Sequence, residues 1–268
     1  MRTALVTGAS SGIGQACATR LARGGWRVLA GVRRAGDAPK GTEEVLLDVT
    51  NDEQISAAAA EVEELHGLVN NAGIALAGPL ELIPVEELRH QLEVNLVGQV
   101  AVTQAFLPAL RRAKGRVVFM GSIAGRSALP FLGPYAASKH ALEAVADSLR
   151  VELRPFGIHV SIVEPGTIKT PIWTRSAARA DELIEELQDG RLDELYGQRI
   201  TAFRKLAMKR GAAGAPADAV AQVVLDALTA ERPRTRYLVG RDAKLRAGFE
   251  RLPDRLRDRI YERVLLRT

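Results

Sequence analysis

Short apolar runs recur along the chain, separated by longer segments in which apolar residues repeat at helical spacing. The short runs predict buried strands at residues 4–6, 25–32, 45–49, 67–70, 117–121 and 159–163. The longer segments predict helices, most clearly at residues 52–65, 85–113 and 135–153. Segment 35–44 is short and holds Gly36, Pro39 and Gly41, so no full crossover helix is expected there. Strands that alternate with helices imply a parallel sheet with helices on both faces.

A glycine-rich turn follows the first predicted strand and leads directly into a helical pattern. Its glycines are Gly8, Gly12 and Gly14. A turn of this kind binds phosphate, because free backbone N–H groups and the helix dipole both face the anion. The spacing differs from the better-known G-x-G-x-x-G fingerprint. The alternative is a simple tight turn, but the strand–loop–helix context favours a phosphate site.

The end of the second predicted strand bears on the choice of dinucleotide. An NAD site is expected to carry a carboxylate here, which accepts bonds from the ribose hydroxyls. The chain instead has Val32 followed by Arg33 and Arg34. A guanidinium suits a 2′-phosphate. These residues therefore favour NADP(H) over the alternative, NAD(H), although two arginines after a strand can also be plain surface.

Tyr135 and Lys139 are four residues apart, so they lie on one face of the predicted helix. A nearby ammonium can lower the pKa of a phenol by roughly 1–3 units from its usual value near 10, towards the range of a general acid or base. Ser122 directly follows an apolar run. Asn95 stands among apolar helix residues, and a buried asparagine must be hydrogen-bonded, either as a structural tie or as part of a proton path. A tyrosine and a solvated lysine on a surface helix are the alternative.

Six segments that follow predicted strands carry small, polar or charged residues. They are residues 8–14, Arg33, Asp48, residues 70–73, Ser122 and residues 165–170. The carboxyl ends of parallel strands meet at one edge of a sheet, and ligands bind there. We therefore expect these segments to form one site.

The same motifs resemble the short-chain dehydrogenase/reductase family, in the family's order. They are Thr-Gly-x-x-x-Gly-x-Gly at 7–14, Asn-Asn-Ala-Gly at 70–73, the helix residue Asn95, Ser122 before Tyr-x-x-x-Lys at 135–139, and Pro-Gly-x-x-x-Thr at 165–170. The resemblance is continuous to about residue 170 and weaker beyond. The predicted fold is a single Rossmann-type domain over residues 1–268, a doubly wound parallel sheet of about seven strands. A substrate-binding helical lid is expected at 172–211 and a helical extension at 241–268.

The resemblance implies a role for each matched residue. Ser122 would polarise the substrate oxygen, Tyr135 would exchange the proton, and Lys139 would lower the phenol's pKa and bind the nicotinamide ribose. Asn95 would hold a water that relays protons to Lys139. The implied cofactor contacts are Gly8, Ser10, Ser11, Gly12, Ile13 and Gly14 at the pyrophosphate; Arg33, Arg34, Asp48 and Val49 at the adenosine; Asn70, Asn71, Ala72 and Gly73 beside the dinucleotide; and Pro165, Gly166, Ile168 and Thr170 at the nicotinamide, with Tyr135 and Lys139.

Composition and charge add limits. The chain has 268 residues and a formal net charge of +5, but no basic run interleaved with aromatic residues, so nucleic acid is not an expected partner. It has no long apolar run of the kind a transmembrane helix needs and no signal peptide, so we expect a cytoplasmic protein. Cys17 is its one cysteine, which excludes an internal disulfide. No metal site is expected.

The substrate side of the sequence is mostly apolar. Apolar residues after residue 73, between Ser122 and Tyr135, and over 174–211 would line a cleft under a movable lid, or would simply pack on the body. No cluster of fixed charges indicates a charged substrate, although Lys169, Arg175 and Arg179 are near enough to the predicted cleft to influence which substrate binds. The basic amphipathic segment 255–266 is expected to dock on the body.

Segments 236–240 and 252–256 resemble the hydroxysteroid and retinol dehydrogenase branch of the family. This implies a ketone or aldehyde, or the matching alcohol, on a bulky apolar skeleton such as a steroid, retinoid or lipid. The family resemblance also implies a homodimer or homotetramer. A non-catalytic NADP-sensing regulator on the same fold is the alternative, and such a protein is expected to lose part of Ser122, Tyr135 and Lys139.

Overall fold

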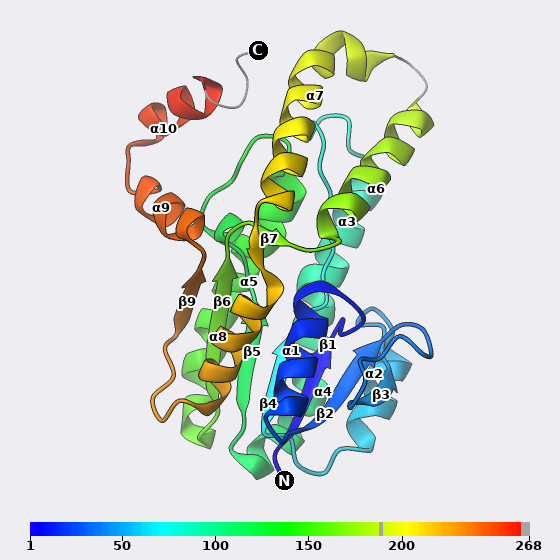
Figure 1. Ribbon diagram of the computed structural model, residues 1–268, viewed down its shortest axis with the longest axis vertical. Coiled ribbons are helices and arrows are strands. Elements are labelled where there is room, and N and C mark those ends of the chain that lie inside the picture. Colours follow the sequence, from blue (N-terminus) through cyan, green and yellow to red (C-terminus); the bar gives the residue numbers. More distant parts are fainter. Residues whose placement is uncertain (188–189, 264–268) are drawn as a thin grey trace.

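The computed structural model describes residues 1–187 and 190–263. Its centre is a seven-stranded parallel sheet in the order β3-β2-β1-β4-β5-β6-β9 (Figure 1). The strands are β1 (Thr3–Thr7), β2 (Arg27–Val32), β3 (Glu43–Leu46), β4 (Gly67–Asn70), β5 (Arg116–Met120), β6 (His159–Pro165) and β9 (Arg236–Val239). The order reverses between β1 and β4, which is where a doubly wound sheet opens a ligand crevice. The predicted Rossmann-type fold is confirmed.

Helices cover both faces of the sheet. One face is covered by α1 (Gly12–Arg23) and α8 (Ala217–Thr229), the other by α2 (Asp52–Ala60), α4 (Gly98–Ala113) and α5 (Gly133–Glu152). Side chains alternate along a strand, so in β1 Ala4 and Val6 pack under α1 and α8 while Leu5 packs on the opposite side. Both faces are buried, which explains why the strands read as continuous apolar runs.

The structure differs from the expected elements in several places. The helix expected at 52–65 ends at Ala60, and the seventh strand, β9, was not among the strands located from the sequence. The third strand ends at Leu46, because it is an edge strand whose register with β2 ends at the pair Val32 and Leu46, so Asp48 lies beyond it. The long helix predicted at 85–113 is divided into α3 (Val85–Leu92), the π-helical turn η1 (Glu93–Val97) and α4. The π-turn contains Asn95, and such turns are frequent at functional sites.

Two helices and a C-terminal segment stand above the carboxyl edge of the sheet (Figure 1). The helices are α6 (Ile172–Leu187) and α7 (Arg191–Ala212), and the short strands β7 (Ile168–Lys169) and β8 (Ala215–Pro216) pair at their base. The C-terminal segment contains α9 (Arg241–Phe249) and α10 (Asp254–Tyr261). The helix expected at 255–266 coincides in part with α10, and its last residues lie outside the described part of the chain. Within the described ranges, no helix has the length and apolar character to cross a membrane.

Candidate active site

The glycine-rich loop is folded against the end of β4. Gly8 and Gly12 have φ of 64° and 58°, in the left-handed region that favours glycine. A Cβ added at Gly14 would lie 2.3 Å from the Gly8 carbonyl oxygen, so only glycine fits there. Helix α1 begins at Gly12, and its N-cap Ser11 makes no side-chain capping bond. The first-turn N–H groups therefore remain available to an anion, and this cradle fits a pyrophosphate.

The Asn-Asn-Ala-Gly turn holds that loop in place. Asn71 Nδ2 donates to the carbonyl oxygens of Thr7, at 2.9 Å, and Gly8, at 3.3 Å. Thr7 Oγ1 accepts from the backbone N–H groups of Asn71 and Ala72, both at 3.0 Å. Asn70, in contrast, is fully buried and donates to Thr103 Oγ1 at 2.8 Å. Its side chain therefore ties β4 to α4 rather than facing the loop.

The adenosine end of the crevice is open. Asp48 is half-buried, and its Oδ1 accepts from Thr50 N at 3.0 Å and Thr50 Oγ1 at 2.8 Å. Arg34 is exposed and donates to Asp37 Oδ2 at 3.1 Å. Arg33 is also exposed and makes no hydrogen bond or ion pair with any residue of the described ranges. The Arg33 guanidinium beside this edge is therefore free to bind a phosphate.

The segment after β6 crosses back to the glycine loop. A Cβ added at Gly166 would lie 2.2 Å from Asp242 Oδ1, and Thr167 N donates to Asp242 Oδ2 at 2.6 Å. The Thr170 side chain packs against Gly12, 3.4 Å from where a Cβ would stand. Ile168 between them is buried. This segment thus spans from the candidate reacting groups to the phosphate loop.

Ser122, Tyr135 and Lys139 meet at the carboxyl end of β5. Ser122 Oγ caps η2 (Ile123–Gly125) by accepting from Ala124 N at 3.1 Å, and it lies near enough to the Tyr135 phenol to affect the pKa of that group. Lys139 is 4% exposed, and its Nζ donates to the Met120 carbonyl at 2.7 Å. The same Nζ lies 5.8 Å from the centroid of the Tyr135 ring. Three polar groups from two neighbouring elements therefore face one point.

Burial dominates the electrostatics of this group. It raises the pKa of the Tyr135 phenol, while the hydrogen bond to Ser122 and the charge of Arg246 act in the opposite direction. Burial lowers the pKa of Lys139 to about 8, against the attraction of Glu143. Arg246 lies on α9, and the sequence alone did not single it out. An arginine more than a hundred residues away carries no local signal of this proximity.

Asn95 acts through its side chain as a structural tie. Its Oδ1 accepts from Ile74 N at 2.8 Å, and its Nδ2 donates to the Ile74 carbonyl at 2.9 Å and to Ser138 Oγ at 3.0 Å. These bonds join η1, the strand-end turn after β4 and the residue next to Lys139. The sequence left two roles open for Asn95, a structural hydrogen-bonding role and a part in a proton path. The bonds made by its side chain correspond to the structural role, and the water relay stays a prediction.

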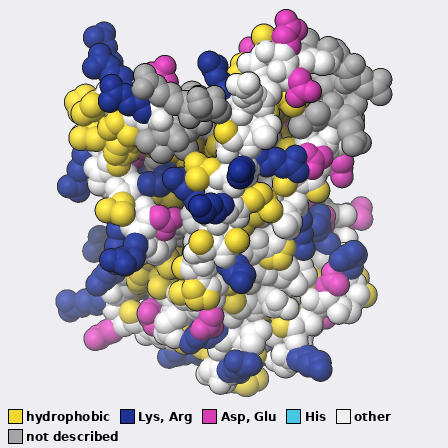
Figure 2. All heavy atoms as spheres, turned by 45° about the horizontal axis from the view of Figure 1, so that its top comes forward, with side chains coloured by type: hydrophobic (Ala, Val, Ile, Leu, Met, Phe, Trp, Pro, Cys, Tyr) yellow, Lys and Arg dark blue, Asp and Glu magenta, His cyan; other side chains and the backbone are white. Residues whose placement is uncertain are grey.

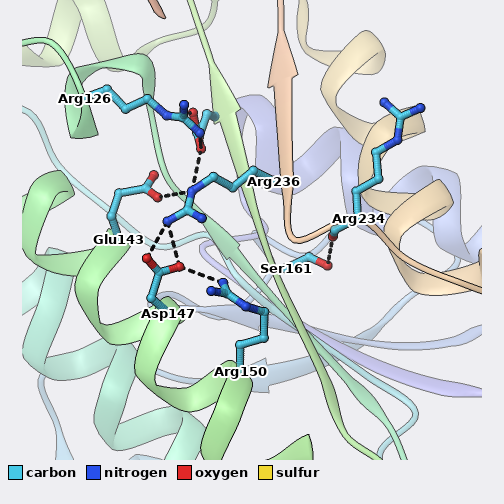
Figure 3. Close-up of polar contacts among 8 residues, drawn as sticks. Arg126, Glu143, Asp147, Arg150, Ser161, Arg234 and Arg236 are labelled. Atoms are coloured by element: carbon cyan, nitrogen blue, oxygen red, sulfur yellow. Dashed lines mark hydrogen bonds and ion pairs between the residues drawn. The ribbon is translucent and has the colours of Figure 1, made fainter. Parts of the chain in front are cut away.

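A network of charged residues joins α5, β6 and β9 (Figure 3). Glu164, fully buried at the end of β6, pairs with Arg126 at 2.6 Å and with Arg236 of β9 at 3.5 Å. Arg236 also donates to Glu143 Oε2 at 3.0 Å and to both carboxylate oxygens of Asp147 at 2.7 Å. Burial and the charge of Glu164 raise the pKa of Glu143 to about 7. Glu143 follows Lys139 by one helical turn, so the network sits directly beneath the reacting groups.

A cavity of about 850 Å³ lies among the helices above the sheet, and Ser122, Tyr135 and Lys139 are not among its lining residues. Its lining is mostly apolar and includes Leu82, Leu129, Leu132, Trp173, Leu183, Phe203 and Leu206. Leu129 and Leu132 come from the segment between Ser122 and Tyr135. Phe131 of that segment packs against Tyr196 and Phe203 of α7, with ring centroids 6.1 and 5.3 Å apart. The cavity therefore adjoins the reacting groups through this shared segment.

The profile of the short chain dehydrogenase family matches residues 2–181. The chain belongs to the short-chain dehydrogenase/reductase family. It is an oxidoreductase that acts on CH–OH or C=O groups, and the family uses NAD(P). Within the described ranges, no three His, Cys, Asp or Glu side chains converge as a metal site would require.

The relatives of this short-chain dehydrogenase match over nearly its whole length. It is 36% identical to the NADPH-dependent 3-dehydrocapnine reductase of Ornithobacterium rhinotracheale, over 99% of this chain and 98% of that protein. It is 39% identical to the human 17-beta-hydroxysteroid dehydrogenase type 6, over 96% and 87%. A short chain dehydrogenase from Burkholderia cenocepacia, solved in complex with NADP, has a TM-score of 0.76 at 27% identity with full coverage of both chains. The chain is of the hydroxysteroid/retinol dehydrogenase-like branch.

Proposed function

We propose that this protein is an NADP(H)-dependent oxidoreductase that interconverts a ketone or aldehyde and an alcohol on a bulky, apolar molecule. The observation that carries the proposal is the meeting of Ser122, Tyr135 and Lys139 at one strand end, between the glycine loop and the apolar cavity. Hydride transfer needs a dinucleotide on one side and a carbonyl on the other. The glycine loop would take the first, and the cavity, which shares Leu129 and Leu132 with the segment between Ser122 and Tyr135, would take the molecule that carries the second.

The residues of the crevice fit NADP(H). The loop of Gly8, Gly12 and Gly14 would hold the pyrophosphate, and Arg33, which has no partner among the described residues, would meet the 2′-phosphate. An NADP-bound structure and an NADPH-dependent enzyme among the similar proteins support this choice. When bound, the cofactor supplies or accepts the hydride.

The protein's own groups handle the oxygen and its proton. In the reductive direction, Ser122 holds the carbonyl oxygen and Tyr135 gives that oxygen its proton. Lys139, held by the Met120 carbonyl, has a pKa of about 8 and is mostly charged at neutral pH. Its ammonium stabilises the phenolate that Tyr135 becomes after giving its proton. Asn95 keeps the turn after β4 and Ser138 in register with this pair.

The space above the site indicates the substrate class. In this proposal, α6 and α7 form a lid, and the cavity under it takes the apolar part of the substrate. Relatives named as retinol and hydroxysteroid dehydrogenases support a bulky skeleton. A homodimer or homotetramer is part of the proposal, and sedimentation of the purified protein tests it.

Tyr135→Phe tests the chemistry. The variant should lose turnover of carbonyl substrates while NADPH still binds with nearly unchanged affinity, because only the proton-transferring oxygen is removed. Tyr237→Phe is a matched control, since Tyr237 of β9 packs on the α1 and α8 side of the sheet and its hydroxyl accepts a bond from the Arg234 N–H just before that strand. Undiminished turnover by Tyr135→Phe would overturn the mechanism. Binding of NADPH without turnover of any ketone or aldehyde by the wild type would favour the NADP-sensing alternative.

A further inference from the structure

Arg246 is a poorly partnered guanidinium at the boundary between the cavity and the reacting groups. It lines the cavity from α9, and its charge acts on Tyr135. Its Nη2 donates to the Ser127 carbonyl at 2.7 Å, while its Nε is buried without any partner among the described residues. A guanidinium has five N–H donors and no acceptor. One neutral carbonyl therefore leaves most of its bonding capacity unused.

No acidic side chain of the described ranges is in direct contact with the Arg246 guanidinium, so its charge is not neutralised by an ion pair. Burial lowers the pKa of Arg246 below its usual value, and the charge of Arg210 acts in the same direction, while Tyr261, Asp242 and Glu250 act against it through longer-range interactions. No carboxylate in the described ranges forms an ion pair with it, because Asp242 is engaged with Thr167 N and Glu250 pairs with Arg257. A half-buried cation in an apolar cavity is costly unless an anion reaches it.

The other basic side chains near the lid are paired with carboxylates, exposed, or outside the cavity. Arg204 pairs with Asp181, and Arg179 pairs with Glu87 and Glu182. Lys169 lines a separate cleft beside Gly12 and does not line the lid cavity. Arg210 and Arg241 also line the cavity but are exposed. Figure 2 shows Lys and Arg side chains among hydrophobic ones on this face of the molecule.

We propose that Arg246 binds an oxyanionic group of the substrate, so that the substrate is an amphiphile rather than a wholly apolar molecule. Its apolar chain lies in the cavity under α6 and α7, its carbonyl meets Ser122 and Tyr135, and its anionic group pairs with Arg246 only a few bonds from that carbonyl. This assignment rests on the proposed oxidoreductase function. It also accounts for the position of Arg246, whose anchor Ser127 belongs to the segment that connects Ser122 to Tyr135.

The experiment compares a medium-chain γ-oxo carboxylate with its primary amide, which has nearly the same size and shape but no charge. Each is reduced with NADPH and followed by absorbance. Wild type is expected to prefer the carboxylate in kcat/KM by roughly tenfold or more, as for a charge-assisted hydrogen bond. Arg246→Gln should bring that ratio close to one, and Arg246→Lys should keep part of it. Lys244→Gln is the matched control on the same helix, because Lys244 is exposed and outside the cavity lining; it should keep the wild-type ratio.

The ratio separates recognition from a general structural role, since damage to the fold or to Tyr135 lowers both probes alike. A wild-type ratio near one, or a ratio unchanged in Arg246→Gln, overturns the inference and leaves the oxidoreductase function standing. A second measurement needs no turnover: binding of a medium-chain alkyl carboxylate and of the matching alkanol to wild type with NADP⁺ present. Stronger binding of the carboxylate supports the inference even if neither probe is reduced or the variant does not fold. Equal or weaker binding contradicts it.

Discussion

As pH rises, the Glu143→Gln variant should gain stability relative to wild type. The quantity that changes is the difference in unfolding free energy between the two proteins. Glu143 is buried beneath Lys139, and its carboxylate bonds Arg236 at 3.0 Å while its other oxygen has no partner among the described residues. A glutamine keeps an acceptor for Arg236 and has nearly the same shape. The substitution thus removes mainly the charge.

The magnitude follows from the pKa of Glu143, which burial and then the charge of Glu164 raise from 4.5 to about 7. A carboxyl whose pKa is raised on folding holds its proton more tightly in the native state than in the unfolded state. The free energy of unfolding of wild type therefore falls as pH rises from 4.5 through 7, by about 3 kcal/mol in total at roughly 1.4 kcal/mol per pH unit. Of this, about 2–3 kcal/mol develops between pH 5 and pH 8. The glutamine side chain of the variant does not titrate and carries no such loss.

Urea denaturation of wild type and Glu143→Gln near pH 5 and near pH 8 measures this effect. The difference in unfolding free energy between the two proteins should move by about 2–3 kcal/mol in favour of the variant on going to the higher pH. Titrating groups that do not interact with Glu143 are common to both proteins and cancel. Glu152→Gln, at an exposed position on the same helix, should follow wild type at both pH values. A pH-independent difference for Glu143→Gln would refute the assignment of a proton to this buried carboxyl.

The cofactor crevice and the core allow three further predictions. Gly14→Ala should abolish NADPH binding in a fluorescence titration, because the added Cβ would lie 2.3 Å from the Gly8 carbonyl oxygen. The control is Gly248→Ala, whose Cβ would meet nothing within 4 Å, and this variant should bind NADPH normally. Arg33→Asp should lose the preference for NADPH over NADH in kcat/KM, by roughly tenfold or more for a lost charge-assisted contact to phosphate; an unchanged ratio would remove Arg33 from the site. Cys17, whose pKa burial raises to about 12, should not react with a maleimide at neutral pH until urea unfolds the protein, and rapid labelling of the native protein would contradict this.

The strands, the glycine loop and the Tyr135–Lys139 pair were predictable because each depends on residues close together in the chain. Buried parallel strands are apolar on both faces, so their runs are visible without any alignment. A spacing of four places two side chains on one helix face in any fold. The carboxyl ends of parallel strands share an edge, so the order of the motifs already implied that Gly8–Gly14, Ser122 and Tyr135 would meet.

Side-chain partners over long sequence distances were not predictable. Asn70 and Asn71 are neighbours in one motif, yet Asn71 braces the glycine loop and Asn70 bonds Thr103 in the core, because successive side chains of a strand point to opposite faces. The π-turn at Asn95 also left no mark in the apolar pattern, since one widened turn barely changes helical spacing.

The fold, the family and the candidate reacting groups of this protein can be read from the order of its residues, because local spacing and strand-end chemistry are enough to define them. The position of Arg236 between Glu143 and Glu164, and that of Arg246 between Tyr135 and the cavity, became apparent only once the chain was seen in three dimensions. These arginines come from β9 and α9, which return to the sheet after the two helices above it. Their charges act through space over a few ångströms, and no periodicity along the chain encodes such a distance.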